Sequence, residues 1–263
     1  MNVSELLPMA VGIAREAGAL AARRRSQGVA IAATKSAVAD IVTEADREVE
    51  SLIRDRLKAQ RPNDGFLGEE SGSAGETTGL TWVVDPIDGT VNYAYGIPSY
   101  AVSIAAVSGS SNPETWVNEI GVVFNPMSGE LFHATRGGGA WLGETRLQMS
   151  PEPTEAGALL ATGFGYDPAT HAAALALLAR VMPLARDIRR IGAASLDLAF
   201  VAAGRLDAYY ERGLHPWDHA AGALLVSEAG GRVGGAPSGR PGRDMTIAAG
   251  SAFYDRLAAA IES

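Results

Sequence analysis

The chain reads Trp82-Val83-Val84-Asp85-Pro86-Ile87-Asp88-Gly89-Thr90 at the point around which its fold is expected to form. The apolar residues that open this stretch predict a short buried strand. Pro86 holds Asp85 in extended geometry, because a residue before proline avoids helical backbone angles. Asp88 follows three residues later, and the glycine after it allows a turn that a residue with a Cβ would resist. The stretch therefore predicts two carboxylates at one strand end, with the N–H groups of Gly89 and Thr90 able to face an anion.

The two carboxylates favour a bound cation. Neighbouring carboxylates repel each other unless a proton or a metal ion lies between them. The stretch holds no histidine and the whole chain lacks cysteine, so the ligands would be oxygen atoms, which suit Mg²⁺ better than zinc. Taken alone, Asp85-Pro86-Ile87-Asp88 is more typical of an Asp-Pro turn capped by an aspartate. The wider pattern of the chain favours the metal site.

Two further motifs make the chain resemble the inositol monophosphatase family. The segment Trp82 to Tyr93 is preceded by Gly68-Glu69-Glu70-Ser71 and followed far downstream by Trp217-Asp218-His219-Ala220-Ala221-Gly222, in the family's order. The resemblance spans about Lys35 to Gly231 and is specific for the superfamily rather than for one substrate. Members are Mg²⁺-dependent, lithium-sensitive phosphatases. The resemblance thus implies an α+β or α/β fold, the layered αβαβα sandwich of the inositol monophosphatase and fructose-1,6-bisphosphatase type.

The resemblance also implies which residues form the site. Two or three Mg²⁺ ions, with Li⁺ as an inhibitor, would bind Glu69, Asp85, the backbone carbonyl of Ile87, Asp88 and Asp218. A water molecule would attack the phosphate directly, oriented or deprotonated by residues from the set Asp46, Glu69, Glu70 and Thr90. Substrate contacts would come from Lys35, Gly89, Thr90, Ala193, Ala194 and Glu211.

Several of these residues also have a purely structural interpretation. Thr43 and Asp46 have the spacing of a capping box at a helix start, and a helix dipole would stabilise Asp218 without any metal. Lys35 equally suits a solvated loop, and the four histidines lack metal-ligand spacing, so we assign them no chemistry. The family usually has Ser or Thr where this chain has Ala193. That departure removes a possible hydrogen bond and weakens the case for any one polyol.

The overall composition argues against several classes of protein. The chain has 263 residues, of which 47% are hydrophobic, enough for a sizeable core. Its net charge of −8 argues against a general surface for nucleic acid or anionic membrane. No apolar run reaches the ~18 residues of a membrane span, and the N-terminus does not have signal-peptide order. With no cysteine, a cytoplasmic protein is expected, and the resemblance implies a homodimer.

Hydrophobic periodicity predicts the elements around the motifs. Helices are expected at 2–26, 43–57, 169–181, 193–203, 217–229 and the C-terminus, with a short helix and turn at 92–98. Strands are expected at 29–33, 82–84, 101–107, 116–124, 130–135, 159–162, 206–210 and 247–249, with a tight loop and a short strand at 137–141 and a loop at 72–79. The Pro- and acid-rich segment 150–155 would divide a single domain, 1–263, into two halves. The N-terminal half, 1–149, would carry most metal ligands, and the C-terminal half, 150–263, would carry Asp218 and the substrate contacts.

Different functions remain open from the sequence. The first is hydrolysis of a phosphate monoester, with myo-inositol 1-phosphate as the preferred substrate. Histidinol phosphate or a broad range of sugar phosphates is the alternative, because relatives with the same signatures do that chemistry. A binding or regulatory protein that retains the fold without turnover belongs to a different class. The complete set of acidic side chains favours an enzyme.

Overall fold

The structure, a computed structural model, describes residues 3–28, 31–34, 41–74, 79–110, 112–235 and 239–263. Its helices are α1 (Val3–Ser26), α2 (Glu44–Gln60), α3 (Thr90–Tyr95), α4 (His171–Val181), α5 (Ala194–Ala202), α6 (Pro216–Glu228) and α7 (Tyr254–Glu262), with short 3₁₀ helices η1 (Pro168–Thr170) and η2 (Met182–Leu184). Its strands are β1 (Ile31–Thr34), β2 (Ile41–Thr43), β3 (Gly65–Gly68), β4 (Gly72–Ala74), β5 (Leu80–Asp88), β6 (Ala101–Ser108), β7 (Val117–Phe124), β8 (Leu131–Thr135), β9 (Gly139–Leu142), β10 (Thr145–Arg146), β11 (Ala158–Thr162), β12 (Ala185–Arg189), β13 (Ala208–Glu211), β14 (Gly231–Gly234) and β15 (Thr246–Gly250). In these residues β1 and β2 pair with each other, and the other strands form two larger sheets.

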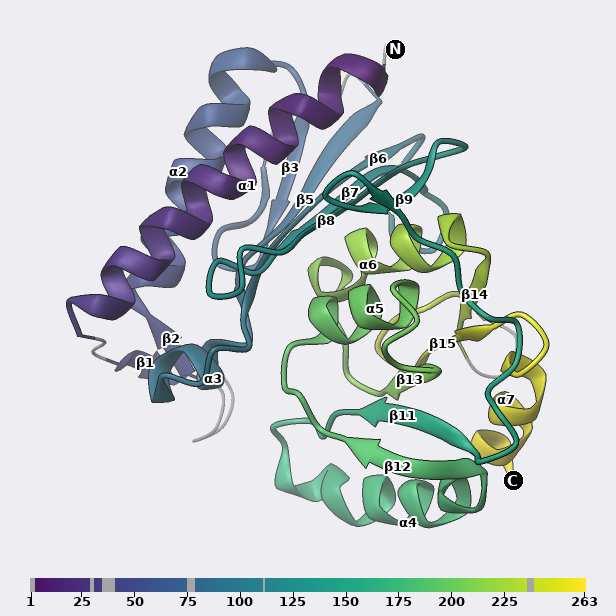
Figure 1. The fold of residues 1–263 in the computed structure, drawn as a ribbon. Helices are drawn as coiled ribbons and strands as arrows, with labels where there is room; N and C mark the ends of the chain where they lie inside the picture. The colour runs from purple at the N-terminus through teal and green to yellow at the C-terminus, as the bar shows by residue number, and fades with distance from the viewer. Residues whose placement is uncertain (1–2, 29–30, 35–40, 75–78, 111, 236–238) are drawn as a thin grey trace.

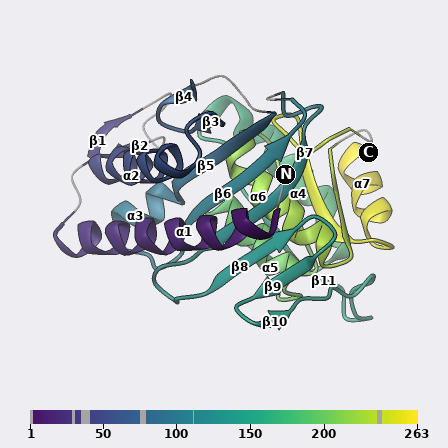
Figure 2. The same cartoon turned by 90° about the horizontal axis from the view of Figure 1, so that it is seen from above.

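The first large sheet has eight strands in the order β10-β9-β8-β7-β6-β5-β3-β4. Its neighbours run antiparallel except for β3 and β5. Along β5, Val84 faces a core formed with α1 and α2, whereas Val83 faces a core on the opposite side. A strand buried on both faces needs apolar residues at successive positions, which is why this stretch reads as a continuous apolar run. Viewed from above, α1 crosses the sheet over β6 and β7, beside α2 (Figure 2).

The second large sheet has five strands in the order β12-β11-β13-β15-β14. Strands β12, β11 and β13 are parallel, and β15 runs antiparallel to both of its neighbours. Tyr210 lies in the core that this sheet forms with α4 and α7, and Tyr209 lies in the core on the other face. The sheet therefore also has two buried faces.

Helices α5 and α6 lie between the two sheets (Figure 1). Most of their residues are buried, as expected for helices that are apolar nearly all round. The layers follow one another as helices, sheet, helices, sheet, helices, so the expected αβαβα sandwich is confirmed. Among the described residues, no helix combines the length and the apolar character needed to cross a membrane.

Several strands differ from the sequence-based expectation. The expected loop at 72–79 is wrong in part, because Gly72–Ala74 forms β4; residues 75–78 of that stretch lie outside the described residues. The sequence also did not predict β12 and β14, which are the two edges of the five-stranded sheet. Their side chains are largely half-buried or exposed, so charged residues and glycines are tolerated there and no apolar alternation marks the strand.

Candidate active site

Asp85 and Asp88 reach one side of β5 because the strand is irregular between them. In a regular strand, residues three apart point to opposite faces. Asp85 pairs with Ser103 of β6 and Asp88 pairs with Ala101, so three steps on β5 oppose two on β6. Such a bulge re-aims a side chain. The Asp85 carboxylate also accepts a hydrogen bond from the backbone N of Ile87 at 3.1 Å, which holds the irregular turn.

The two aspartates meet a third, which comes from the middle layer. One carboxylate oxygen each of Asp85, Asp88 and Asp218 lies within 4.8 Å of the others. Asp218 is in the first turn of α6, where its carboxylate accepts a hydrogen bond from the backbone N of His215 at 2.6 Å. It therefore caps the helix and belongs to the cluster at the same time. Glu69, at the end of β3, bonds to Asp85 and adds a fourth acid.

The chemistry of these donors fits a divalent cation. Burial raises the pKa of Asp85 well above its usual range, and the charges of Glu69, Asp88 and Asp218 raise it further. Burial raises the pKa of Asp218 as well, and the charges of Asp88 and Glu69 raise it further. These acids cannot all be ionised side by side unless a positive charge joins them. A buried set of carboxylate oxygens is a donor set that Mg²⁺ accepts.

Asp88 also connects the first sheet to the middle layer. Its carboxylate accepts hydrogen bonds from the backbone N of Ala194 at 3.2 Å and from the backbone N and the hydroxyl of Ser195. These N–H groups belong to the start of α5, whose positive dipole end favours a carboxylate. Burial raises the pKa of Asp88, and the bonds from Ser195 oppose that shift. Sequence reasoning missed Ser195, because nothing local links it to a partner 107 residues away.

Thr90 begins α3 beside this cluster. Its hydroxyl lies 3.2 Å from a carboxylate oxygen of Asp46 and 3.1 Å from the carbonyl oxygen of Ile87. The preceding Gly89 has φ +92°, and a Cβ there would lie 3.0 Å from the carbonyl oxygen of Ser99 and 3.1 Å from the Ala193 Cβ. Only glycine fits this turn without strain, and its close approach brings the start of α3 against the start of α5.

A buried glutamate that the sequence did not single out supports the Glu69-Glu70 turn. Glu50 of α2 is 2% exposed, and its carboxylate accepts hydrogen bonds from the backbone N of Glu70 at 2.7 Å and of Ser71 at 2.9 Å. The side chain of Glu70 lies 3.8 Å from Arg47. Glu50 follows Asp46 by four residues on one face of α2, a spacing that could have marked it.

The candidate substrate residues lie in different places. Glu211 ends β13 with its carboxylate bonded to the hydroxyl of Tyr209, and burial raises the pKa of Glu211 to about 7. Ala193 and Ala194 lie at the start of α5, next to Gly89 and Asp88. Lys35 lies outside the described residues.

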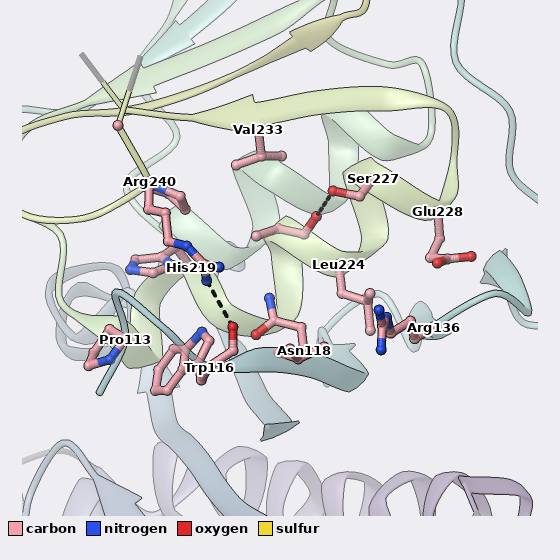
Figure 3. Close-up of a pocket in the computed structure, with 14 residues that line it drawn as sticks. Pro113, Trp116, Asn118, Arg136, His219, Leu224, Ser227, Glu228, Val233 and Arg240 are labelled. Atoms are coloured by element: carbon pink, nitrogen blue, oxygen red, sulfur yellow. Dashed lines mark hydrogen bonds between the residues drawn. The ribbon is translucent and has the colours of Figure 1, made fainter. Parts of the chain in front are cut away.

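A separate pocket of about 470 Å³ lies on the flank of α6 (Figure 3). It is lined by residues that include Trp116, Asn118, His219, Ser227 and Arg240, and by none of the clustered carboxylates. This pocket is therefore distinct from the candidate active site.

The chain is similar to known proteins in sequence and in fold. A profile of the inositol monophosphatase family matches residues 2–263. Inositol-1-monophosphatase SuhB of Mycobacterium tuberculosis is 42% identical, over 98% of this chain and 94% of that relative. Nus factor SuhB of Escherichia coli is 42% identical, over 87% of this chain and 84% of that relative. The crystal structure of extragenic suppressor protein suhB from Bartonella henselae superimposes with a TM-score of 0.90 and 37% identity, covering 98% of this chain and 99% of that one.

Proposed function

The chain belongs to the inositol monophosphatase family, and from this premise we propose that it is an Mg²⁺-dependent phosphoric monoester hydrolase that converts myo-inositol 1-phosphate to inositol and phosphate. The observation that carries the proposal is the convergence of Asp85, Asp88 and Asp218 on one point. Buried acids with raised pKa values cluster at functional sites more often than elsewhere. The names of the mycobacterial relatives support the substrate.

In this proposal the acidic cluster holds the metal. The ligands are Glu69, Asp85, the backbone carbonyl of Ile87, Asp88 and Asp218, and two or three Mg²⁺ ions are expected. When bound, Mg²⁺ would polarise the phosphate, lower the pKa of a coordinated water and stabilise charge on the leaving oxygen. The proposal includes inhibition by Li⁺ and a cytoplasmic homodimer.

Thr90 and Asp46 would orient the attacking water. The Thr90 hydroxyl has one proton, and Asp46 and the Ile87 carbonyl both lie within reach to accept it. With its proton directed to either acceptor, the hydroxyl oxygen can accept a hydrogen bond from the water. A proton lost by the water would pass through Thr90 to Asp46, or to Glu69 or Glu70. The water attacks the phosphorus directly, and no covalent intermediate with the protein is needed.

The remaining groups would bind the substrate. The backbone N–H groups of Gly89 and Thr90, at the start of α3, suit the phosphate, and Lys35 would add a positive charge. Ala193 and Ala194, next to Gly89 and Asp88 at the start of α5, would also contact the substrate. Glu211 would accept hydrogen bonds from hydroxyls of the alcohol portion, where its carboxylate could equally pair with the ammonium of histidinol phosphate.

A panel of phosphate-release assays tests the proposal. Purified protein with Mg²⁺ should release phosphate faster from inositol 1-phosphate than from histidinol phosphate, and a chelator should abolish both activities. Glu211→Gln should lower kcat/KM for inositol 1-phosphate about five- to thirtyfold and spare an aryl phosphate. If the wild type hydrolyses histidinol phosphate or a broad range of sugar phosphates faster than inositol 1-phosphate, the alternative substrate would replace the proposed one.

A second candidate function rests on the relatives named Nus factor SuhB. Their names favour a regulatory or binding role, which this chain could have with or without turnover. Release of no phosphate from any substrate in the panel, by folded protein with Mg²⁺, would favour a binding role alone. Activity in the panel would leave the catalytic proposal standing, whatever else the protein binds.

A further inference from the structure

The carboxylate of Glu211 lies beside the end of β11, a neighbouring strand in the five-stranded sheet. Glu211 is the last residue of β13, and Thr162 of β11 pairs with Tyr210, the residue before it. Gly163 follows Thr162 directly, so it lies beside Glu211 where the parallel strands end. The carboxylate therefore has Gly163 on one side and the hydroxyl of Tyr209, from its own strand, on another.

Gly163 leaves the space that the Glu211 carboxylate occupies. A Cβ built on Gly163 would overlap Oε1, Oε2 and Cδ of Glu211. A methyl group here would therefore displace the carboxylate from its observed position. Gly163 is not among the glycines with positive φ, and its backbone would accept alanine. The requirement at this position is room, not backbone freedom.

Tyr209 fixes one of the two carboxylate oxygens. Its hydroxyl donates a hydrogen bond to Oε2 of Glu211. Tyr209 is fully buried, and burial together with the charge of Glu211 raises the pKa of its phenol well above the usual range. The phenol thus keeps its proton and acts as a donor. With Oε2 engaged by Tyr209, Oε1 can accept hydrogen bonds from another group.

We propose that Gly163 and Tyr209 are positioning residues that hold Glu211 with one carboxylate oxygen presented to a hydroxyl of the substrate alcohol, so that all three residues together select a polyol phosphate over a simple phosphate ester. The inference rests on the proposed function and deepens it. Glu211 is the group that touches the substrate, and the other two act only through it. Their replacement should therefore affect the alcohol portion of the substrate and not the phosphate chemistry.

The adjacent tyrosines provide a matched pair of variants. Tyr209→Phe removes the hydroxyl that donates a hydrogen bond to Glu211. Tyr210→Phe removes a hydroxyl on the opposite face of the five-stranded sheet, in the core formed with α4 and α7. Both lose one buried oxygen from β13. We expect Tyr209→Phe to lower kcat/KM for myo-inositol 1-phosphate about five- to thirtyfold, mostly through a higher KM. The same variant should change kcat/KM for 4-nitrophenyl phosphate by less than about twofold. Tyr210→Phe should change neither substrate by more than about twofold.

Gly163→Ala tests the second contact independently. It should also lower kcat/KM for inositol 1-phosphate and spare the aryl phosphate. In a Glu211→Gln background, Gly163→Ala and Tyr209→Phe should each add much less than they do alone, because residues that act through one group are not additive. Circular dichroism spectra should show that each variant is folded.

Two results would overturn the inference while leaving the phosphatase in place. One is an equal loss on both substrates in Tyr209→Phe, which would mean a general structural role. The other is wild-type kinetics on inositol 1-phosphate in both Tyr209→Phe and Gly163→Ala. Wild-type protein that hydrolyses the aryl phosphate but not inositol 1-phosphate would instead refute the proposed substrate, and this positioning role with it.

Discussion

Asp88 in the eight-stranded sheet accepts two hydrogen bonds from Ser195 at the start of α5, one from the backbone N at 2.6 Å and one from the hydroxyl. These hydrogen bonds join β5, which carries Asp85 and Asp88, to α5 in the helix layer between the two sheets. Asp88 therefore has two roles in one carboxylate. It closes the contact between layers, and it supplies negative charge to the cluster with Asp85 and Asp218.

Asp88→Asn should nearly abolish turnover while leaving the fold intact. The amide oxygen can still accept the hydrogen bonds from Ser195, and only the bond from the Ala194 N–H is given up. The charge that would bind Mg²⁺ is lost. Loss of one acid also relieves repulsion in the metal-free protein, so its melting temperature should not fall much. Ser195→Ala, which keeps the carboxylate and the backbone N–H, is the matched control. Retention of more than roughly a tenth of wild-type kcat at saturating Mg²⁺, a barrier change of only about 1.4 kcal/mol, would remove Asp88 from the site.

The fold was predictable where side chains follow a local period. The central strands and the helices of the sandwich have such periods, and the expected layers agree with the structure. The edge strands β12 and β14 were missed because most of their side chains are half-buried or exposed, so no apolar alternation marks them. Within the site, the sequence predicted two carboxylates at one strand end. It could not show that a bulge between Asp85 and Asp88 turns them to one side, because the bulge exists only relative to β6.

Contacts between distant segments were also beyond the sequence. The bonds from Ser195 to Asp88 and from the turn after Glu69 to Glu50 depend on how separate layers pack. The room that Gly163 leaves for Glu211 appears only when β11 and β13 are paired. A lone glycine after a strand has many explanations, and its sequence neighbours do not distinguish between them.

Mg²⁺ should stabilise the protein more at high pH than at low pH. Burial and mutual repulsion raise the pKa values of Asp85 and Asp218 in the metal-free fold. The folded state then binds more protons than the unfolded state above the ordinary carboxyl pKa, so metal-free stability falls as pH rises. Mg²⁺ favours the ionised form and removes that loss. At a hundredfold excess over its Kd it should add about 2.7 kcal/mol.

Thermal unfolding with Mg²⁺ and with a chelator, at about pH 5 and about pH 8, measures this effect. The shift caused by Mg²⁺ should be larger at the higher pH. Asp85→Asn is the control, and its shift should be smaller at both values. A shift independent of pH, or unchanged in Asp85→Asn, would mean that Mg²⁺ binds elsewhere.

Thr90→Val and Thr90→Ser separate the hydroxyl from the shape of the side chain. Valine matches the size of threonine but cannot bond Asp46 or orient a water, so kcat should fall roughly a hundredfold or more. Serine keeps the hydroxyl and should retain kcat within about tenfold. The losses should be the same for inositol 1-phosphate and for an aryl phosphate, because Thr90 acts on the water and not on the alcohol. Equal activity of Thr90→Val and wild type would exclude Thr90 from the chemistry.

The titration of Glu211 should make the free energy of unfolding depend on pH. Burial raises its pKa from 4.5 to about 7, although the bond from Tyr209 and the charge of Arg190 oppose the shift. The folded protein therefore holds this proton more tightly than the unfolded chain does. Since the folded state binds more protons between about pH 4.5 and about pH 7, the contribution of Glu211 to stability declines as pH rises through that window. Glu211→Gln has no proton to lose, and its amide oxygen can still accept the bond from Tyr209.

The stability of Glu211→Gln relative to wild type should consequently increase as pH rises from about 5 to about 8, by on the order of 2 kcal/mol. This is less than the full linkage value, because the side chain of Glu211 is partly accessible to water. Urea unfolding of both proteins with a chelator present, at several pH values, gives the difference directly. Tyr210→Phe is the control: burial raises the pKa of Tyr210 from 10.0, so its phenol does not titrate in this window and its difference from wild type should stay flat. The stability of Glu211→Gln relative to wild type could instead stay constant or decrease as pH rises. Glu211 would then already be ionised in the folded protein near pH 5, with its carboxylate stabilised by a positive charge closer than Arg190.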